Sequence, residues 1–254
     1  MKRIVILTAL GIFGGLSASI AQLPAADKIK TAAGDLKIQP VFHAAMVLSW
    51  NNKTIYVDPY NGPKAYKGQE APDLILITDI HGDHMDTATL NALNTGNAKL
   101  IVPKAVADLL PEQYKAGLIV INNGANTVVE GITITAIPMY NLPEAPDAKH
   151  TKGRGNGYVL ELGGKRIYIS GDTEDIPEMR NLKNIDVAFV CMNLPYTMPV
   201  DHAASATLDF KPRIVYPYHY RNQDGFSDVA TFKNLVNKSN KNIEVRLRDW
   251  YAKP

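Results

Sequence analysis

Several features that define special classes of protein are scarce in this chain of 254 residues. It contains one cysteine, Cys191, which excludes a disulfide framework because such a framework needs pairs. Basic and acidic residues nearly balance, 27 Lys and Arg against 25 Asp and Glu, so no basic stripe argues for nucleic acid as a partner. Charged residues make up only 20% of the chain and hydrophobic residues 46%, an ordinary globular composition. A disordered chain, a coiled coil and a collagen-like fibre are therefore excluded.

The apolar run at the N-terminus is too short to span a bilayer. Lys2 and Arg3 precede an apolar stretch over residues 4–16, and Ser19 and Ala21 provide the small residues of a cleavage site. A membrane anchor would need about 20 apolar residues. We therefore expect residues 1–21 to be a cleaved signal peptide and the protein to be periplasmic or secreted, with no membrane span after cleavage. Cleavage would remove two basic residues and leave 25 of each sign.

Apolar runs and alternations predict many short strands and few helices in residues 22–254, which we expect to form a single α/β domain. The expected helices cover residues 86–93, with Asp86 as the N-cap, 104–110 and 227–237. Residues 141–156 carry Pro and Gly without an apolar period and predict a long loop, which is uncommon unless functional. The expected strands are 36–42, 46–50, 53–57, 74–78, 99–102, 118–121, 128–129, 132–137, 157–162, 165–170, 186–190, 213–216 and 243–247.

A dense group of potential metal ligands follows the apolar run 74–78, in the sequence Asp79-Ile80-His81-Gly82-Asp83-His84. The alternate residues Asp79, His81 and Asp83 can converge on one side, whereas the adjacent Asp83 and His84 can serve two different ions. Imidazole together with carboxylate suits Zn, Mn or Fe. The plain alternative is a polar turn with a helix cap. Asp86 already fills the cap role, and a turn does not need two histidines, so the pattern favours a metal site.

Three further polar residues follow predicted strands in the same way. Asp172 comes after the strand 165–170, His219 after 213–216, and Asp58 after 53–57. Each alone would suit a cap or a hydrogen-bonded core residue, but their shared position at strand ends indicates that Asp172 and His219 join the metal site. Asp58 has no neighbouring ligand, so we expect it to orient a histidine rather than bind the ion.

Taken together, these blocks resemble the metallo-β-lactamase superfamily of metal-dependent hydrolases. That family has an aspartate after an early strand, then His-x-His-x-Asp-His, and then a later His, an Asp and a final His. The corresponding residues here are Asp58, then Asp79-x-His81-x-Asp83-His84, then Asp172 and His219, and the resemblance covers about residues 35–250. Phe42-His43-Ala44 is similar to the opening of the branch that includes sugar-phosphate lactonases and phospholipid-cleaving phosphodiesterases. The resemblance implies a four-layer αββα sandwich with metal ions at one edge of the two sheets.

The chain departs from the family pattern at two places. Asp79 stands where the first histidine belongs, and the block after strand 132–137 reads Pro138-Met139-Tyr140-Asn141, with no histidine. The resemblance thus implies one complete site, from Asp83, His84 and His219 with Asp172 as a bridge, and a first site reduced to His81 and Asp79. His150, nine residues past Asn141, is a candidate for the missing ligand or for substrate binding. We expect one or two Zn²⁺ ions, with Mn²⁺ or Fe²⁺ as alternatives because of the extra carboxylate.

These residues predict an exported hydrolase in which a metal-bound hydroxide attacks a small ester, lactone or phosphodiester, since a bound divalent ion lowers the pKa of water to about 7. Asp83 and Asp172 are the expected catalytic residues. The substrate is expected to be a small molecule, and the basic residues of the loop 141–156 would suit an anionic group. Residues with a possible role in orienting ligands or lining the pocket are Asp58, His43, Tyr140, Asn141 and His150, with Tyr196 and Tyr218 as further lining candidates.

Two other interpretations compete with this one. A calcineurin-like phosphoesterase would share Asp79-x-His81 and Gly171-Asp172, but its Gly-Asn-His and Gly-His-x-His blocks are missing from the chain. A non-catalytic exported metal- or ligand-binding protein would account for the degraded first site. The sequence leaves the substrate, the metal, the number of ions and the oligomeric state open. The clustered Asp and His residues argue against a purely structural module.

Overall fold

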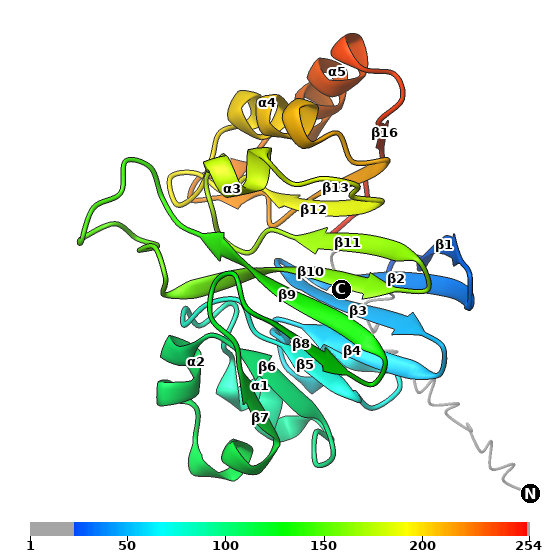
Figure 1. The fold of residues 1–254 in the computed structure, drawn as a ribbon, viewed down its shortest axis with the longest axis vertical. Helices are drawn as coiled ribbons and strands as arrows, with labels where there is room; N and C mark the ends of the chain where they lie inside the picture. The colour runs from blue at the N-terminus through cyan, green and yellow to red at the C-terminus, as the bar shows by residue number, and fades with distance from the viewer. Residues whose placement is uncertain (1–22, 253–254) are drawn as a thin grey trace, which may run out of the picture.

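Two seven-stranded sheets, stacked face to face, form the middle of the molecule (Figure 1). The computed structural model describes residues 23–252. The predicted signal peptide, residues 1–21, therefore lies outside the described residues. No helix within residues 23–252 has the length and apolar character needed to cross a bilayer.

The first sheet has the strand order β1-β2-β3-β4-β5-β6-β7. Its first four strands form an antiparallel meander, and β4 to β7 run parallel. The predicted turn at Asn51 and Asn52 is confirmed, and both residues have the left-handed φ (49° and 58°) that a tight hairpin requires. The strands are β1 (Asp27–Thr31), β2 (Gly34–Phe42), β3 (Ala45–Trp50), β4 (Lys53–Val57), β5 (Leu74–Leu76), β6 (Lys99–Val102) and β7 (Leu118–Val120).

The second sheet repeats this plan in the order β16-β13-β12-β11-β10-β9-β8. Strands β8 to β11 are antiparallel, and β11, β12, β13 and β16 are parallel. The predicted Gly163-Gly164 turn joins β10 to β11 with positive φ at both residues. The strands are β8 (Asn126–Val129), β9 (Ile132–Met139), β10 (Gly155–Leu162), β11 (Lys165–Ile169), β12 (Val187–Cys191), β13 (Ile214–Tyr218) and β16 (Glu244–Val245); β14 (Arg221–Asn222) and β15 (Gly225–Phe226) form a separate small hairpin.

Helices cover the two outer faces of the sheets (Figure 1). The α1 and α2 helices pack on the first sheet through a cluster that includes Ile75, Leu90 and Val106. A larger cluster fills the space between the sheets and continues to α4 and α5. The predicted four-layer αββα sandwich is confirmed. The helices are α1 (Thr87–Ala92), α2 (Lys104–Leu109), α3 (Pro177–Arg180), α4 (Val200–Phe210) and α5 (Val229–Ser239), with 3-10 turns η1 (Pro63–Tyr66) and η2 (Glu112–Gly117).

Some elements differ from the sequence expectation. Strand β1 and helices α3 and α4 were not predicted, because β1 buries only Ile29 and α4 buries mainly small side chains such as Ala203 and Ala206. The predicted N-cap of α1 is confirmed, since Asp86 accepts a hydrogen bond from the Thr89 N–H. The loop between β9 and β10 ends at residue 154, because β10 already begins at Gly155, whereas the expected loop extends to residue 156. These two sheets and their connections set the positions of the candidate ligands.

Candidate metal centre

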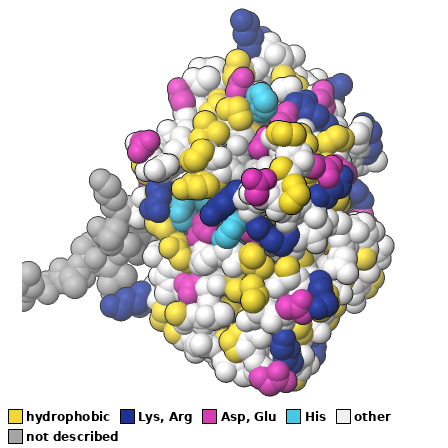
Figure 2. All heavy atoms as spheres, turned by 90° about the vertical axis from the view of Figure 1, so that its left-hand side faces the viewer, with side chains coloured by type: hydrophobic (Ala, Val, Ile, Leu, Met, Phe, Trp, Pro, Cys, Tyr) yellow, Lys and Arg dark blue, Asp and Glu magenta, His cyan; other side chains and the backbone are white. Residues whose placement is uncertain are grey.

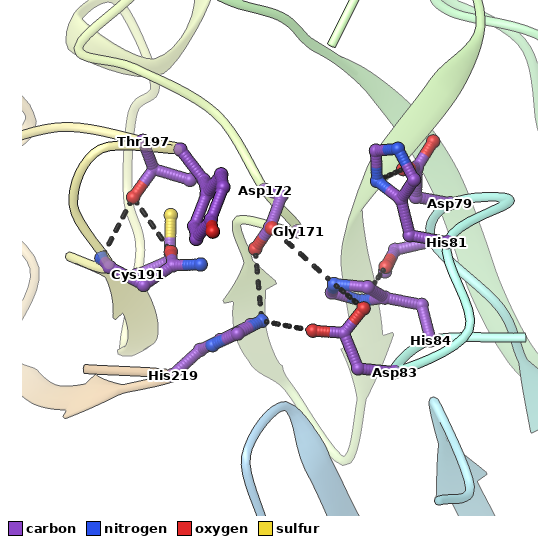
Figure 3. Close-up of polar contacts among 12 residues, drawn as sticks. Asp79, His81, Asp83, His84, Gly171, Asp172, Cys191, Thr197 and His219 are labelled. Atoms are coloured by element: carbon purple, nitrogen blue, oxygen red, sulfur yellow. Dashed lines mark hydrogen bonds and ion pairs between the residues drawn. The ribbon is translucent and has the colours of Figure 1, made fainter. Parts of the chain in front are cut away.

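The candidate ligands meet at one edge of the two sheets, where several parallel strands end. Asp79, His81, Asp83 and His84 follow β5, and the close-up view shows Asp83 and His84 facing Asp172 and His219, with Asp79 and His81 paired to one side (Figure 3). Asp172 follows β11 and His219 follows β13. Open α/β sheets bind ligands outside the carboxyl ends of their strands, because loops there are aimed by rigid ladders. The structure therefore brings together the residues that the sequence places at strand ends.

One group of candidate ligands consists of His84, Asp172 and His219, whose ligand atoms lie within 4.8 Å of one another. His84 Nε2 lies 3.5 Å from Asp172 Oδ2, and His219 Nε2 lies 3.4 Å from Asp172 Oδ1. Asp83 reaches the same group, with Oδ2 at 3.3 Å from His219 Nε2. All three members of the group are buried. The arrangement offers two imidazole nitrogens and two carboxylates to one ion.

A second group consists of Asp79, His81 and His150, again within 4.8 Å. The His150 ring comes from the connection between β9 and β10, and its Nε2 lies 3.4 Å from Asp172 Oδ2 and 3.9 Å from Asp79 Oδ2. His81 Nδ1 lies 2.7 Å from Asp79 Oδ2. His150, the candidate for the missing ligand, thus lies beside Asp79 and His81. Asp172 lies against both groups, which is the position of a bridging carboxylate.

Asn141 holds His150 in this position. Its Oδ1 accepts hydrogen bonds from the backbone N–H of His150 (2.7 Å) and from Nδ1 (3.2 Å), while its Nδ2 donates to Glu174 and to the Tyr196 carbonyl. Because Oδ1 can only accept, the Nδ1 of His150 carries the hydrogen and Nε2 keeps a free lone pair. Asn141, which stands at the sequence position of the absent histidine, therefore fixes the orientation of the His150 ring.

Asp58 acts on His84 in the same manner. Its Oδ2 lies 2.8 Å from His84 Nδ1, and Thr78 donates to the carboxylate through both its N–H and its hydroxyl. The carboxylate accepts from Nδ1, so Nε2 is the ring nitrogen that faces Asp172 and is left for an ion. Asp58 and His219 both have left-handed backbone angles, with φ of 43° and 45°. Such conformations in residues other than glycine are costly and cluster at functional sites.

The donor atoms of these groups fit a cation. Among residues 23–252, the buried atoms without a hydrogen-bond partner include His84 Nε2, His150 Nε2, His219 Nε2 and Asp172 Oδ1. Native proteins rarely leave such atoms unsatisfied, and a group of them that converges on one space has the chemistry of a metal site. Tetrahedral and octahedral divalent ions such as Zn²⁺, Mn²⁺ and Fe²⁺ accept this mixture of imidazole and carboxylate.

The carboxylates of the centre are held in their ionised form. Burial raises the pKa of Asp83 and of Asp172, but the adjacent His84 and His219 lower both pKa values well below the usual range. Burial also opposes ionisation of Asp79, yet the hydrogen bond to His81 and the neighbouring positive groups bring its pKa to about 2. The centre is consequently a concentrated set of negative charges.

Arg154 balances part of that charge, and the sequence did not identify it as more than a loop cation. Its Nε lies 3.1 Å from Asp79 Oδ1 and its Nη2 lies 3.0 Å from Oδ2, a bidentate ion pair. The Asp79 side chain has no exposed surface and that of Arg154 is 19% exposed. A carboxylate in place of a histidine adds a negative charge, and Arg154 offsets it. The available sequence signal was an unexpected acid in the ligand block together with an arginine in the Gly-containing loop 141–156.

A cavity of about 810 Å³ opens onto the centre. His43 lies in its wall, with its ring centroid 4.5 Å from that of His219 and its Nδ1 2.9 Å from the Tyr251 hydroxyl. Tyr196 also lines the cavity, as the sequence analysis allows. Figure 2 shows histidine and acidic side chains gathered on this face, with basic and hydrophobic side chains beside them. The cavity gives a small molecule direct access to the candidate ligands.

Other candidates lie elsewhere. The Tyr140 hydroxyl donates to Glu178, and Tyr140 does not line the cavity. Tyr218 is buried and accepts a hydrogen bond from the Gly171 N–H, so it supports the loop that carries Asp172. Cys191 is a buried core residue. These side chains stabilise the surroundings of the centre rather than facing the cavity.

This chain is similar to one protein family and to relatives and solved structures of metal-dependent hydrolases. The family described as "Beta-lactamase superfamily domain" matches residues 37–219. A UPF0173 metal-dependent hydrolase from Pyrococcus abyssi is 33% identical over 221 residues, which cover 83% of this chain and 96% of that protein. A crystal structure of a metal-dependent hydrolase from Parabacteroides distasonis is 36% identical, covers 88% of this chain and 98% of its own, and superposes with a TM-score of 0.77. A metallo hydrolase from Ignicoccus hospitalis has 25% identity and a TM-score of 0.71, over 84% of this chain and 95% of its own.

Proposed function

The chain belongs to the metallo-β-lactamase superfamily and is a metal-dependent hydrolase, and from this premise we propose that its edge cluster binds two divalent ions and cleaves a small ester, lactone or phosphodiester. In this proposal Asp79, His81 and His150 hold the first ion. Asp83, His84 and His219 hold the second, and Asp172 lies between the two. Zn²⁺ is the favoured metal, with Mn²⁺ and Fe²⁺ as alternatives.

One observation carries the two-ion proposal. His84 comes from the segment after β5 and His150 from the β9–β10 connection, and each has its Nδ1 held by an acceptor, Asp58 in one case and Asn141 in the other. Each therefore presents its Nε2 to the same carboxylate, at 3.5 and 3.4 Å. An acceptor that binds the other ring nitrogen fixes the tautomer of a histidine ligand. A single ion would leave one of these prepared nitrogens without a function.

A divalent ion in this position supplies a water-derived nucleophile at neutral pH and polarises the substrate oxygen. The residues of the chain complete the chemistry. Asp83 is 32% exposed at the cavity and its carboxylate is ionised, so it can accept a hydrogen bond from the attacking water and orient it. Asp172, buried between the histidines, keeps the two groups of ligands at a fixed separation.

His43 supplies a hydrogen-bond donor in the cavity wall beside His219. The Arg221 N–H donates to the Tyr251 oxygen at 3.1 Å, so the hydroxyl hydrogen of Tyr251 is free to donate to His43 Nδ1. The hydrogen of the neutral imidazole then lies on Nε2. Burial and the neighbouring His219 lower the pKa of His43 to about 3, which keeps the ring neutral. An Nε2–H that faces the cavity can stabilise the negative charge that develops on the substrate oxygen.

The size of the cavity supports a small substrate, since about 810 Å³ lies within the range of ligand pockets for small molecules. The apolar run and small residues at the N-terminus support an exported, periplasmic or secreted protein. N-terminal sequencing of the protein purified from its native host tests that part: a first residue at position 22 is expected, and a retained Met1 would refute it.

Metal analysis tests the function. We expect plasma mass spectrometry to find about two ions per chain in the zinc-loaded protein, about one in His150→Ala, and one or fewer in His84→Ala. Loaded wild type should hydrolyse members of a lactone, ester and phosphodiester panel, and His84→Ala should not. One ion in the wild type, unaffected by His150→Ala, would refute the two-ion proposal. The absence of bound metal after loading with Zn²⁺ or Mn²⁺ would refute the assignment of the cluster altogether.

A further inference from the structure

Four basic side chains near the cavity fall into two classes. Lys152 pairs with Glu144 at 3.0 Å and with Glu178 at 3.3 Å, and Arg154 pairs with Asp79. Lys149 and Arg221 have no carboxylate within 4.0 Å anywhere in residues 23–252. The charges of the first two are balanced inside the protein. Those of Lys149 and Arg221 are not.

The two unbalanced cations both line the cavity, and they come from different elements. Lys149 directly precedes the candidate ligand His150 on the β9–β10 connection. Arg221, in β14, comes two residues after the candidate ligand His219. His150 belongs to one group of ligands and His219 to the other. Lys149 therefore lies next to the group of candidate ligands that contains His150, and Arg221 lies next to the group that contains His219.

Aromatic rings support both side chains without neutralising them. Lys149 Nζ lies 5.7 Å from the centre of the Tyr196 ring, and Arg221 Cζ lies 5.9 Å from that of the Phe42 ring. Contacts of a cation with the face of an aromatic ring hold it in place while its charge and N–H donors stay available. Both side chains are exposed, so an incoming ligand can reach them.

The charge of the loaded cavity favours an anion. With Arg154 balancing Asp79, the remaining carboxylates of the centre are Asp58, Asp83 and Asp172. Two divalent ions outweigh these three negative charges, and Lys149 and Arg221 add to the excess. A positively charged cleft with low-dielectric walls concentrates anions and speeds their association.

We propose that Lys149 and Arg221 form a binding site for a carboxylate or phosphate group of the substrate, separate from the bond that is cleaved. The substrate is then a small anion with a hydrolysable group at the metal centre. The planar guanidinium of Arg221 suits bidentate recognition of either group, and Lys149 contributes a point charge. This inference rests on the two-ion hydrolase proposed above.

Binding of simple probes to the zinc-loaded full chain tests the site directly. Isothermal titration would compare succinate, inorganic phosphate and the neutral succinamide, for wild type, Lys149→Ala, Arg221→Ala and Arg221→Lys. Lys152→Ala is the matched control, since it removes a loop lysine whose charge is already paired. Metal content is measured for every variant, so loss of the ions is distinguished from loss of anion binding.

We expect the wild type and Lys152→Ala to bind an anion and not succinamide. Lys149→Ala and Arg221→Ala should each weaken that binding about tenfold or more with unchanged metal content, because charge-assisted hydrogen bonds are lost. Stronger binding of succinate assigns the site to carboxylates, and stronger binding of phosphate assigns it to phosphate. Arg221→Lys should restore part of the affinity. Equal anion affinity in wild type and in the two alanine variants, or no anion binding by the loaded wild type, would overturn the proposal while the two-ion function still stands on its metal content.

Discussion

The Asp79–Arg154 ion pair provides a sharp test of whether an ion lies beside Asp79. Arg154→Ala removes two hydrogen bonds, at 3.1 and 3.0 Å, from a carboxylate that has no exposed surface. Breaking a buried ion pair by removing one partner costs about 3–5 kcal/mol. The Arg154 side chain is 19% exposed and His81 still contacts Asp79, so the lower end of that range applies. We expect the metal-free protein to lose about 3 kcal/mol of its free energy of unfolding.

The zinc-loaded protein should respond differently, because an ion bound by Asp79 supplies the compensating positive charge. We expect urea denaturation to give a loss of only about 1 kcal/mol in the loaded Arg154→Ala variant. In the metal-free protein, adding Asp79→Asn to Arg154→Ala should recover most of the loss, since no buried charge remains. Equal losses with and without zinc would refute an ion at Asp79. A double variant as unstable as Arg154→Ala would refute the ion-pair reasoning itself.

The same carboxylate gives the metal-free protein a defined response to pH. The pKa of Asp79 falls from 3.8 to about 2, since the His81 hydrogen bond and nearby positive charges outweigh the effect of burial. A depressed pKa in the folded state contributes stability above the unfolded value, and that contribution is lost as the pH falls through the folded value. Wild type should therefore lose its advantage over Asp79→Asn between about pH 4 and pH 2. Urea titrations across this range measure the difference, and a constant difference would contradict the assignment.

Three further substitutions separate metal binding, hydrogen-bond donation to the substrate and backbone packing. Asp58→Ala frees His84 Nδ1 and should weaken zinc binding about 10- to 100-fold by competition with a chelator; unchanged affinity would argue against an orienting role. His43→Gln should lower kcat about 100-fold with full zinc content, and loss of zinc instead would make His43 a ligand. Gly155→Ala would place a Cβ 2.8 Å from the Thr78 carbonyl oxygen and should destabilise the fold by about 2 kcal/mol in thermal denaturation; wild-type stability would show that the two backbone segments can move apart there.

The sequence predicts most of the centre because its residues stand at the ends of apolar runs. Asp58, Asp172 and His219 each follow a continuous buried strand, and parallel strands end at a common edge. The strand and helix pattern predicts a single α/β domain, and the resemblance to the metallo-β-lactamase superfamily implies the sandwich. Helix α4 was not predicted from the sequence, because small residues such as Ala203 and Ala206 give its buried face no strong apolar period.

The positions of His150 and Arg154 could not be predicted in this way. Both lie in a connection without periodicity, and their places are set by contacts with residues distant in the chain. Arg154 forms an ion pair with Asp79, which is 75 positions away in the sequence. His150 is held by a hydrogen bond to Asn141, nine residues before it. The sequence shows that a histidine is missing and that another lies nearby, but only the folded chain brings the two facts together.

His150 lies in a loop connection rather than at the end of a strand. This position has a consequence for cooperativity between metal binding and anion binding. Lys149 is the adjacent residue, so one peptide unit joins a candidate metal ligand to a candidate anion-binding side chain. An ion that fixes the His150 ring also fixes the backbone that carries Lys149. An anion bound to Lys149 in turn favours the conformation in which His150 binds the ion. Linkage makes such an effect reciprocal: each ligand raises the affinity for the other by the same factor. Zinc affinity measured with and without a saturating anion would give the size of that coupling.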